Sequence, residues 1–325
     1  MKVATSALQT YLANNDNVVV CDLYTFDLVG IGALRYADYP LAAMAIPKTS
    51  FPDTHSLNHG TSGTLGFVRG PRFGRSKVST KIGIEPAEVD IACYPAPISA
   101  AETEDTIGDL SWQEFGLSGG FDGAIVEIDR LFFPIGGDGF TGPLDFSLGS
   151  IIWFYGKMAN VEIERSRISF KVKALINVLQ QQQMPRRIYQ SGCSHIFGDT
   201  MCGYDRVAGK NALGNPTGNG AVNITAIAGS SQTDIVISPG TTFLFTQGSC
   251  VGLTGANAGI TRGIISNAIS TVIGLARPFP FTVSVGDTFQ LLPGCDHTIS
   301  TCNGTFNNLL RFGGMPFIPP PEISI

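Results

Sequence analysis

Four of the seven cysteines lie in two short segments of the second half of the chain, and they constrain its fold more than any other feature. Cys193 and Cys202 form one pair, and Cys295 and Cys302 form the other. A histidine follows two residues after the first cysteine of each pair, so the segments CSHIFGDTMC and CDHTISTC look like two versions of one unit. Four thiolates that meet from two distant segments form a metal site.

The spacing of the pairs, C-x8-C and C-x6-C, bears on the metal that such a site would take. Zinc ribbons and fingers usually have cysteines about two to four residues apart, so zinc is permitted but not favoured. Iron–sulfur clusters are held by four thiolates from wider and more varied spacings. The pattern also leaves open that these are unrelated buried or disulfide-bonded cysteines.

The three other cysteines and the two nearby histidines have plainer interpretations. Cys21, Cys93 and Cys250 each stand alone in an apolar, strand-like context, which predicts small buried hydrophobic side chains. A histidine beside a metal site more often orients or tunes the ligands than replaces one. We therefore expect His195 and His297 to lie beside the site or on the surface.

Composition indicates a subunit of an assembly, with a monomer of unusually polar, uncharged surface as the alternative. Hydrophobic residues make up 43% of the chain and charged residues only 14%, whereas soluble proteins carry about 25% charged residues. The net charge of -5 argues against a surface that binds DNA without regard to sequence. No apolar signal-peptide core opens the chain, and its longest uncharged apolar stretch, 263–276, is too short to span a bilayer. We expect synthesis in a reducing cytosol and no membrane span.

The periodicity of apolar residues predicts a mainly β fold with few, short helices. Helices are expected at 4–14, 107–117 and 173–182. Strands are expected at 18–20, 23–29, 34–36, 77–84, 89–94, 124–129, 151–155, 161–164 and 168–172, and again at 221–226, 234–238, 242–245 and 281–285. Charge nearly vanishes between 211 and 290, which indicates a small β-domain between the two cysteine pairs.

Catalytic motifs receive no support from the sequence. The run from Gly137 to Gly142 matches G-x-G-x-x-G, but Pro143 follows where a dinucleotide site needs a helix, so a loop is expected. No nucleophile grouping or paired-carboxylate motif stands out. If Asp109, Glu114 or Asp129 were catalytic, the pattern would not reveal it. We predict that the protein is not an enzyme.

Further motifs accompany the cysteines. Phe306-Asn307-Asn308 and Arg311-Phe312-Gly313-Gly314-Met315-Pro316 close the C-terminal set, and other marked segments lie at 23–28, 34–36, 121–124, 184–186 and 189–190. With them the chain resembles the tail-tip hub proteins of long non-contractile-tailed phages and gene transfer agents, the lambda-type family. The resemblance covers most of the chain, and the cysteine quartet with this ending is its most specific part.

The resemblance implies a domain plan. Tail-tube-like β-barrel or sandwich domains, two of them interlocked, would occupy 1–180. A cysteine-stapled, iron–sulfur-binding region would combine 181–210 with 291–325, and a small inserted β-domain would span 211–290.

The resemblance also implies a function: a virion protein at the tail tip, made in the host cytoplasm, that forms a homotrimeric ring. Its partners would be the distal tail protein and tail tube, the tape measure protein and the central fibre or receptor-binding tip protein, with DNA only in transit. Carried over residue by residue, the ligands of a four-iron cluster would be Cys193, Cys202, Cys295 and Cys302. Two alternatives stay open: a tail-tip binding module stapled by zinc, and an iron–sulfur redox enzyme.

Overall fold

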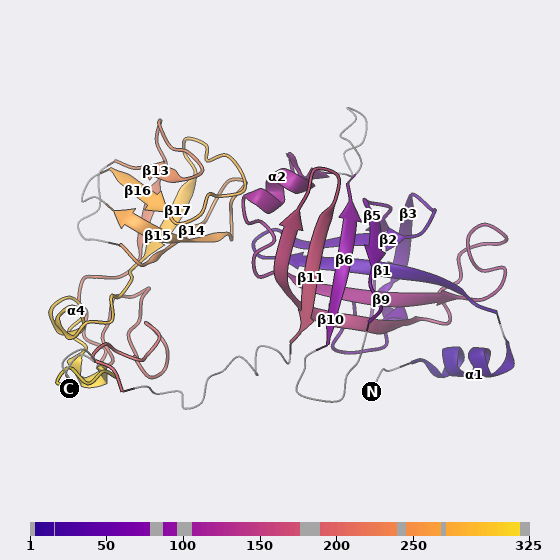
Figure 1. The fold of residues 1–325 in the computed structure, drawn as a ribbon, viewed down its shortest axis with the longest axis horizontal. Helices are drawn as coiled ribbons and strands as arrows, with labels where there is room; N and C mark the ends of the chain where they lie inside the picture. The colour runs from indigo at the N-terminus through magenta and orange to yellow at the C-terminus, as the bar shows by residue number, and fades with distance from the viewer. Residues whose placement is uncertain are drawn as a thin grey trace, which may run out of the picture. The chain divides into compact units, whose positions relative to one another are not determined.

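The computed structural model describes residues 4–15, 17–78, 87–95, 106–175, 189–238, 245–267 and 271–318. The chain divides into two compact units, Met1–Gln181 and Gln182–Ile325, each described by itself below (Figure 1). Among the described residues, strands outnumber helices in both units, so the predicted mainly β fold class is confirmed. Among the described residues no helix is long and apolar enough to cross a membrane. The finer division at 210 and 290 stays a prediction.

A nine-stranded sheet dominates the described part of the first unit, in the order β3-β4-β2-β1-β9-β10-β11-β6-β5. Neighbouring strands are antiparallel, except that β2 and β4 are parallel. The strands are β1 (Val19–Leu28), β2 (Gly32–Asp38), β3 (Ala43–Pro47), β4 (Thr64–Val68), β5 (Arg72–Arg75), β6 (Glu88–Tyr94), β9 (Ile125–Phe133), β10 (Ser150–Ile163) and β11 (Ile168–Ala174).

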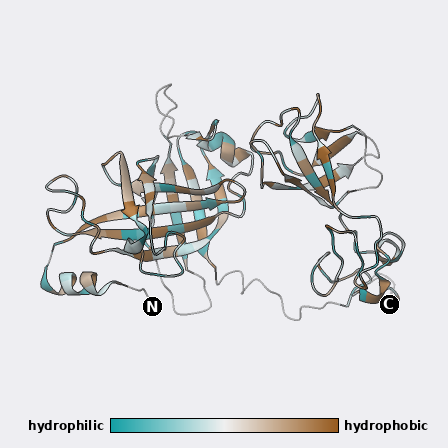
Figure 2. Cartoon of the chain, turned by 180° about the vertical axis from the view of Figure 1, so that it is seen from behind, coloured by the Kyte–Doolittle hydropathy of each residue, from teal (hydrophilic) through white to brown (hydrophobic). Residues whose placement is uncertain are grey.

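Alternate side chains of a strand point to opposite sides, and on the central strand β1 both sides are covered by other residues. Cys21 and Leu23 join one apolar cluster, which includes Phe67 of β4. Phe26 on the other face contacts a second group of aromatic rings, with Trp112 edge-on at 5.9 Å. Figure 2 shows hydrophobic and hydrophilic stretches alternating along the strands of this unit.

The sheet curls so that its edge strand β5 lies against β1, five places away in the strand order. The rings of Phe73 on β5 and Tyr24 on β1 are stacked, with their centroids 4.8 Å apart. Beside them, Nη2 of Arg75 lies 2.7 Å from the carboxylate of Asp22. Two irregularities in β10, where the register shifts, help to bend it. In Figure 1, β6 and β11 accordingly run across the direction of β1 and β9.

The helices of the first unit partly match expectation. The predicted opening helix is α1 (Ser6–Asn14), which buries Leu8. The helix predicted at 107–117 is wrong in its first half, where β7 (Thr106–Ile107) and β8 (Leu110–Ser111) form a hairpin. Gly108 takes the positive φ of 63° that this turn requires. α2 (Trp112–Leu117) then begins with a capping box between Ser111 and Glu114. A short 3₁₀ helix, η1 (Lys48–Ser50), follows β3.

The second unit carries a six-stranded antiparallel sheet in the order β12-β17-β14-β15-β16-β13. Its elements are β12 (Val222–Thr225), β13 (Asp234–Val236), β14 (Ser249–Gly252), β15 (Thr261–Asn267), β16 (Val272–Leu275), β17 (Thr288–Leu292), α4 (Ile299–Gly304) and η3 (Leu309–Arg311).

One predicted strand of this unit, 281–285, is wrong. Asn257 captures the backbone of Phe281 with both side-chain atoms, and Ser284 donates its N–H to the carboxylate of Asp287, so this segment pairs with side chains instead of a strand. Most of the predicted segments 77–84, 173–182 and 242–245 lie outside the described residues.

Candidate functional site

The second unit brings all four residues of the cysteine quartet (Cys193, Cys202, Cys295 and Cys302) to one small cavity. Cys295 follows β17, and Cys302 lies on α4. None of the four is in a disulfide. The two segments join directly, because the N–H of Cys193 donates to the carbonyl of His297 at 2.8 Å. Other residues that line the cavity are His195, Phe197, His297, Thr298, Phe306 and Arg311.

An aspartate turn shapes each cysteine segment. The carboxylate of Asp199 accepts the backbone N–H of Cys202 at 2.6 Å. In the second segment, Asp296 accepts the N–H of Thr298 at 2.9 Å, and Thr298 in turn caps α4. Aspartate favours such local bonds because its short side chain reaches the backbone two or three residues on. Each segment is therefore bent by hydrogen bonds within its own sequence.

Donors from three parts of the chain face the sulfur atoms. The N–H of Gly313 lies 3.2 Å from Sγ of Cys193, and that of His297 lies 3.4 Å from Sγ of Cys295. Nδ2 of Asn308 lies 3.7 Å from Sγ of Cys202. A Cβ at position 313 would overlap the ring of His195, so the glycine lets this backbone approach Cys193 without displacing that ring. N–H groups aimed at sulfur stabilise the thiolate form.

Burial opposes ionisation of two of the thiols. Burial, followed by the negative charges of the other three cysteines, raises the pKa of Cys302 to about 11. The pKa of Cys295 is raised chiefly by burial as well. Four thiolates in so small a space repel one another, and a cation between them would reverse the effect.

An aromatic wall closes the site on one side. Tyr204 and Phe306 are buried together with Cys202. The centroids of the Phe197 and Phe306 rings lie 4.6 Å apart. The Tyr204 hydroxyl donates to the carbonyl of Asn219 at 2.9 Å. These residues exclude water from one side of the sulfurs.

Within the described ranges no three His, Cys, Asp or Glu side chains form a ready-made site for one metal ion. The four cysteines of the quartet all line one cavity. His195 and His297 line that cavity, and Nδ1 of His195 lies 3.0 Å from the carbonyl oxygen of Arg311, with which the protonated nitrogen would form a hydrogen bond. Ligand roles for the quartet stay a prediction.

The remaining cysteines behave as expected. Cys21, Cys93 and Cys250 are buried. Burial raises the pKa of Cys250 to about 12, and it also raises the pKa of Cys21. Both are inert thiols under neutral conditions.

Sequence reasoning missed a buried carboxyl pair in the first unit. Glu127 and Asp129 lie two apart on β9 and are 0% and 1% exposed. Glu127 accepts hydrogen bonds from Ser56 and Leu57, and the Asn58 side chain donates to both carboxyl groups. Burial, followed by the charge of Glu127, raises the pKa of Asp129 well above its ordinary value. The alternation at 124–129 predicted the strand but gave no sign that its polar side chains would be buried.

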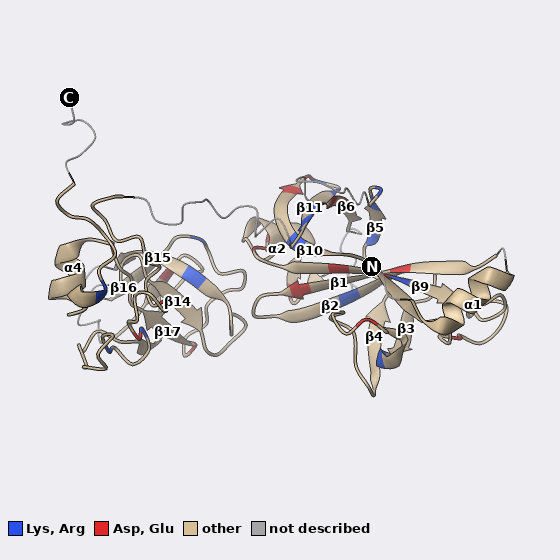
Figure 3. Ribbon diagram, turned by 90° about the horizontal axis from the view of Figure 1, so that it is seen from below, with Lys and Arg blue, Asp and Glu red and all other residues tan. Residues whose placement is uncertain are grey.

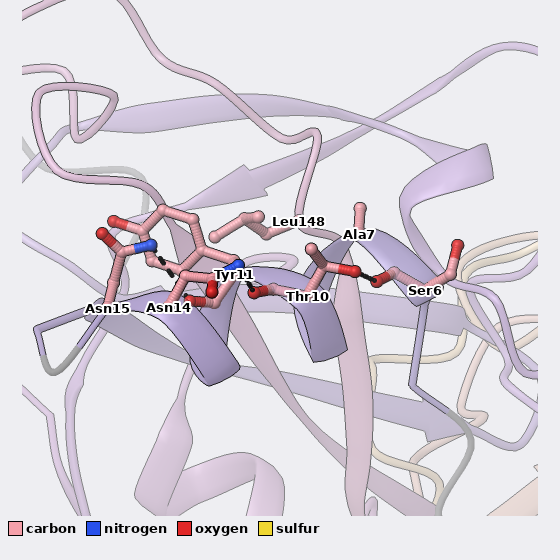
Figure 4. A pocket seen from close by; sticks show the side chains of 7 residues that line it. All are labelled: Ser6, Ala7, Thr10, Tyr11, Asn14, Asn15 and Leu148. Carbon is pink, nitrogen blue, oxygen red and sulfur yellow. Dashed lines mark hydrogen bonds between the residues drawn. The ribbon is translucent and has the colours of Figure 1, made fainter.

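A second hollow lies beside α1, lined by seven residues (Figure 4). Thr10 and Asn14 use their side chains to donate to helix carbonyls at 2.9 Å, and Asn15 does the same at 3.0 Å. Their polar groups are thus engaged with the helix itself. The predicted Gly137–Gly142 segment is a loop, as expected.

The comparisons with known proteins agree with this architecture. A family model described as the N-terminal attachment domain of baseplate hub protein matches residues 5–205, more than half of the chain. A second, described as phage conserved hypothetical protein BR0599, matches residues 243–322. No curated protein matches the chain.

Among solved structures, a chain from the virion of a native gene transfer agent particle has the same fold. The TM-score is 0.66 at 20% identity, over 99% of this chain and 96% of that one. By the match over residues 5–205, the protein belongs to the family of phage baseplate hub proteins.

Proposed function

We propose that this protein is the structural hub of a siphophage-type tail tip, a homotrimeric ring that joins the tail tube to the central fibre and lets DNA pass. Family membership over residues 5–205 carries the proposal. Its partners are the distal tail protein, the tape measure protein and the receptor-binding tip, and its role is architectural instead of catalytic. The likeness to a virion chain along nearly the whole sequence supports the fold that this role needs.

The surface of the second unit supports burial against other chains. Ile196, Leu310 and Phe317 are 75%, 80% and 96% exposed. Figure 3 shows few charged residues in this unit. Large apolar side chains exposed in a charge-poor region are typical of interaction surfaces.

The cysteine quartet is the cofactor site in this proposal, and the group that it holds is a [4Fe-4S] cluster. The residues fit such a group: four soft sulfur donors face one cavity, three N–H groups point at sulfur, and aromatic rings shield one side. When bound, the cluster supplies a rigid metal–thiolate cross-link. This chain's own turns at Asp199 and Asp296 present the sulfurs to it.

Zinc is the alternative occupant, since it takes the same ligands. It needs four sulfurs at about 2.3 Å from one point. The wide spacing of both cysteine pairs, C-x8-C and C-x6-C, favours the cluster over zinc.

Metal analysis of protein purified without oxygen tests the cofactor. We expect about four iron atoms and four acid-labile sulfides per chain. Cys302→Ser removes a buried ligand and should abolish both, whereas the matched control Cys250→Ser alters a buried thiol outside the quartet and should keep them. Equimolar zinc without iron would refute the cluster and leave the hub standing.

Particle assembly tests the hub. Phage particles whose copy of this gene is deleted should have tails without tips, and light scattering of the purified protein should give the mass of a trimer. Complete, infectious particles without the protein would refute the proposal.

A further inference from the structure

Asn308 is a buried polar residue that contacts the second cysteine of the first pair. It is 4% exposed. Its Nδ2 donates to the carbonyl of Cys202 at 2.9 Å and lies 3.7 Å from Sγ of the same residue. Its Oδ1 accepts the N–H of Ala212 at 3.0 Å. The side chain therefore uses both of its polar atoms.

The backbone of Asn308 contacts the second cysteine of the other pair. Its N–H donates to the carbonyl of Cys302 at 2.9 Å. Its carbonyl accepts from the thiol of Cys302 at 3.4 Å, a bond that belongs to the protonated sulfur. One residue thus connects Cys202 with Cys302, which lie a hundred positions apart in the sequence.

The turn that presents Asn308 is itself held from two sides. Asn307, which precedes it, has a φ of 44°, a left-handed conformation that asparagine tolerates better than most residues. Its carbonyl accepts from Nδ2 of Asn211 at 2.9 Å. The turn between α4 and η3 that carries Asn308 is therefore held in place by its own hydrogen bond.

Only an asparagine side chain meets both demands at this position. Aspartate has the same shape, but it would replace the donor with a negative oxygen beside the carbonyl and sulfur of Cys202. Alanine would leave the carbonyl of Cys202 and the N–H of Ala212 without their partner, inside a buried site. Groups that bond to metal ligands from outside fix the ligand geometry, and hydrogen bonds to sulfur set the potential of a cluster.

We propose that Asn308 is a positioning residue: it holds Cys202 and Cys302 in register and donates a hydrogen bond to the sulfur of Cys202. This proposal rests on the quartet being a metal site. Asn308 does not ligate the metal, and its influence passes through the two cysteines.

The test compares Asn308→Ala and Asn308→Asp with a matched control, Asn257→Ala, in the full-length protein purified without oxygen. Asn257 is 0% exposed, lies in the same unit and bonds to the backbone of Phe281 with both side-chain atoms. We expect both Asn308 variants to lose iron to a chelator about 10–100-fold faster than wild type. The cluster that remains should have a more negative midpoint potential, with the larger shift for aspartate because it adds charge.

The control should match wild type in potential and iron loss. Unchanged potential and unchanged iron loss in both Asn308 variants would overturn the positioning role.

A separate measurement distinguishes failure of the metal site from failure of this proposal. If wild-type protein holds neither iron nor zinc, the metal site is refuted. The rate at which iodoacetamide modifies Cys202, measured peptide by peptide, then decides the role of Asn308. Faster modification of Cys202 in the Asn308 variants than in Asn257→Ala supports positioning, and equal rates overturn it.

Discussion

Replacing Asp129 by asparagine should stabilise the first unit at neutral pH, although it changes a fully buried polar residue. Oδ1 of Asp129 has no hydrogen-bond donor beside it in the described part of the chain, whereas Oδ2 accepts from Asn58 at 3.0 Å. The Glu127 carboxyl group on the same strand raises the pKa of Asp129 further, so the buried pair favours a proton on Asp129. Asparagine supplies an acceptor and a donor of the same shape without having to take up a proton.

The sign and size follow from linkage. The pKa of Asp129 is raised in the folded state, so its contribution to stability is fully present below the unfolded pKa of about 3.9 and is lost as pH rises through the folded pKa. Over that window wild type loses about 1.4 kcal/mol per pH unit, and the asparagine variant does not. The advantage of Asp129→Asn should therefore grow with pH, to a ceiling of about 4 kcal/mol at pH 7.

Urea unfolding at pH 5, 6, 7 and 8, followed by tryptophan fluorescence, measures this difference. Both tryptophans of the chain, Trp112 and Trp153, lie in the first unit, so the signal reports that unit alone. The matched variant Glu127→Gln should instead lower the stability of the first unit. Its side-chain amide group would face donors such as Ser56 and Leu57, which need an acceptor. A difference between Asp129→Asn and wild type that does not change with pH, or the opposite order of the two variants, would refute the assignment of the proton.

Three further outcomes follow from the packing. Phe26→Ala should cost the first unit about 3–5 kcal/mol in urea unfolding, because the ring is 0% exposed among other aromatic rings; a loss below 1 kcal/mol would contradict that packing. Cys21 and Cys250 should resist iodoacetamide in the folded protein at pH 8, and mass spectrometry that finds them modified as fast as in urea would show that burial does not protect them. Burial alone would raise the pKa of Asp22, but hydrogen bonds from two arginines hold that pKa below its ordinary value. The stabilising effect of Asp22 is therefore present above about pH 4 and is lost as pH falls through the folded pKa. In thermal unfolding, Asp22→Asn should weaken the protein at pH 7 and change its stability little at pH 2.

Local signals in the sequence predicted local structure well. Alternation identified the strands around 23–29, 89–94 and 168–172 because a half-buried strand repeats every two residues. It failed at 107–117, where apolar spacing fitted a helix but Gly108 permits a hairpin turn and the cap at Ser111 starts the helix later. It failed again at 281–285, because Asn257, far away in sequence, supplies the hydrogen bonds that a neighbouring strand would have supplied.

The sequence by itself determined the cysteine pairs and their flanking motifs, since residue identity and spacing are written directly in the chain. It also determined that Cys21, Cys93 and Cys250 would be buried. Only the tertiary structure decided that the quartet meets at one cavity and that Asn308 forms hydrogen bonds with Cys202 and Cys302, the second cysteine of each pair. Only the tertiary structure, too, buried Glu127 and Asp129 side by side. Periodicity reports which face of an element is covered, but not which distant segment covers it, because that choice is made by long-range packing.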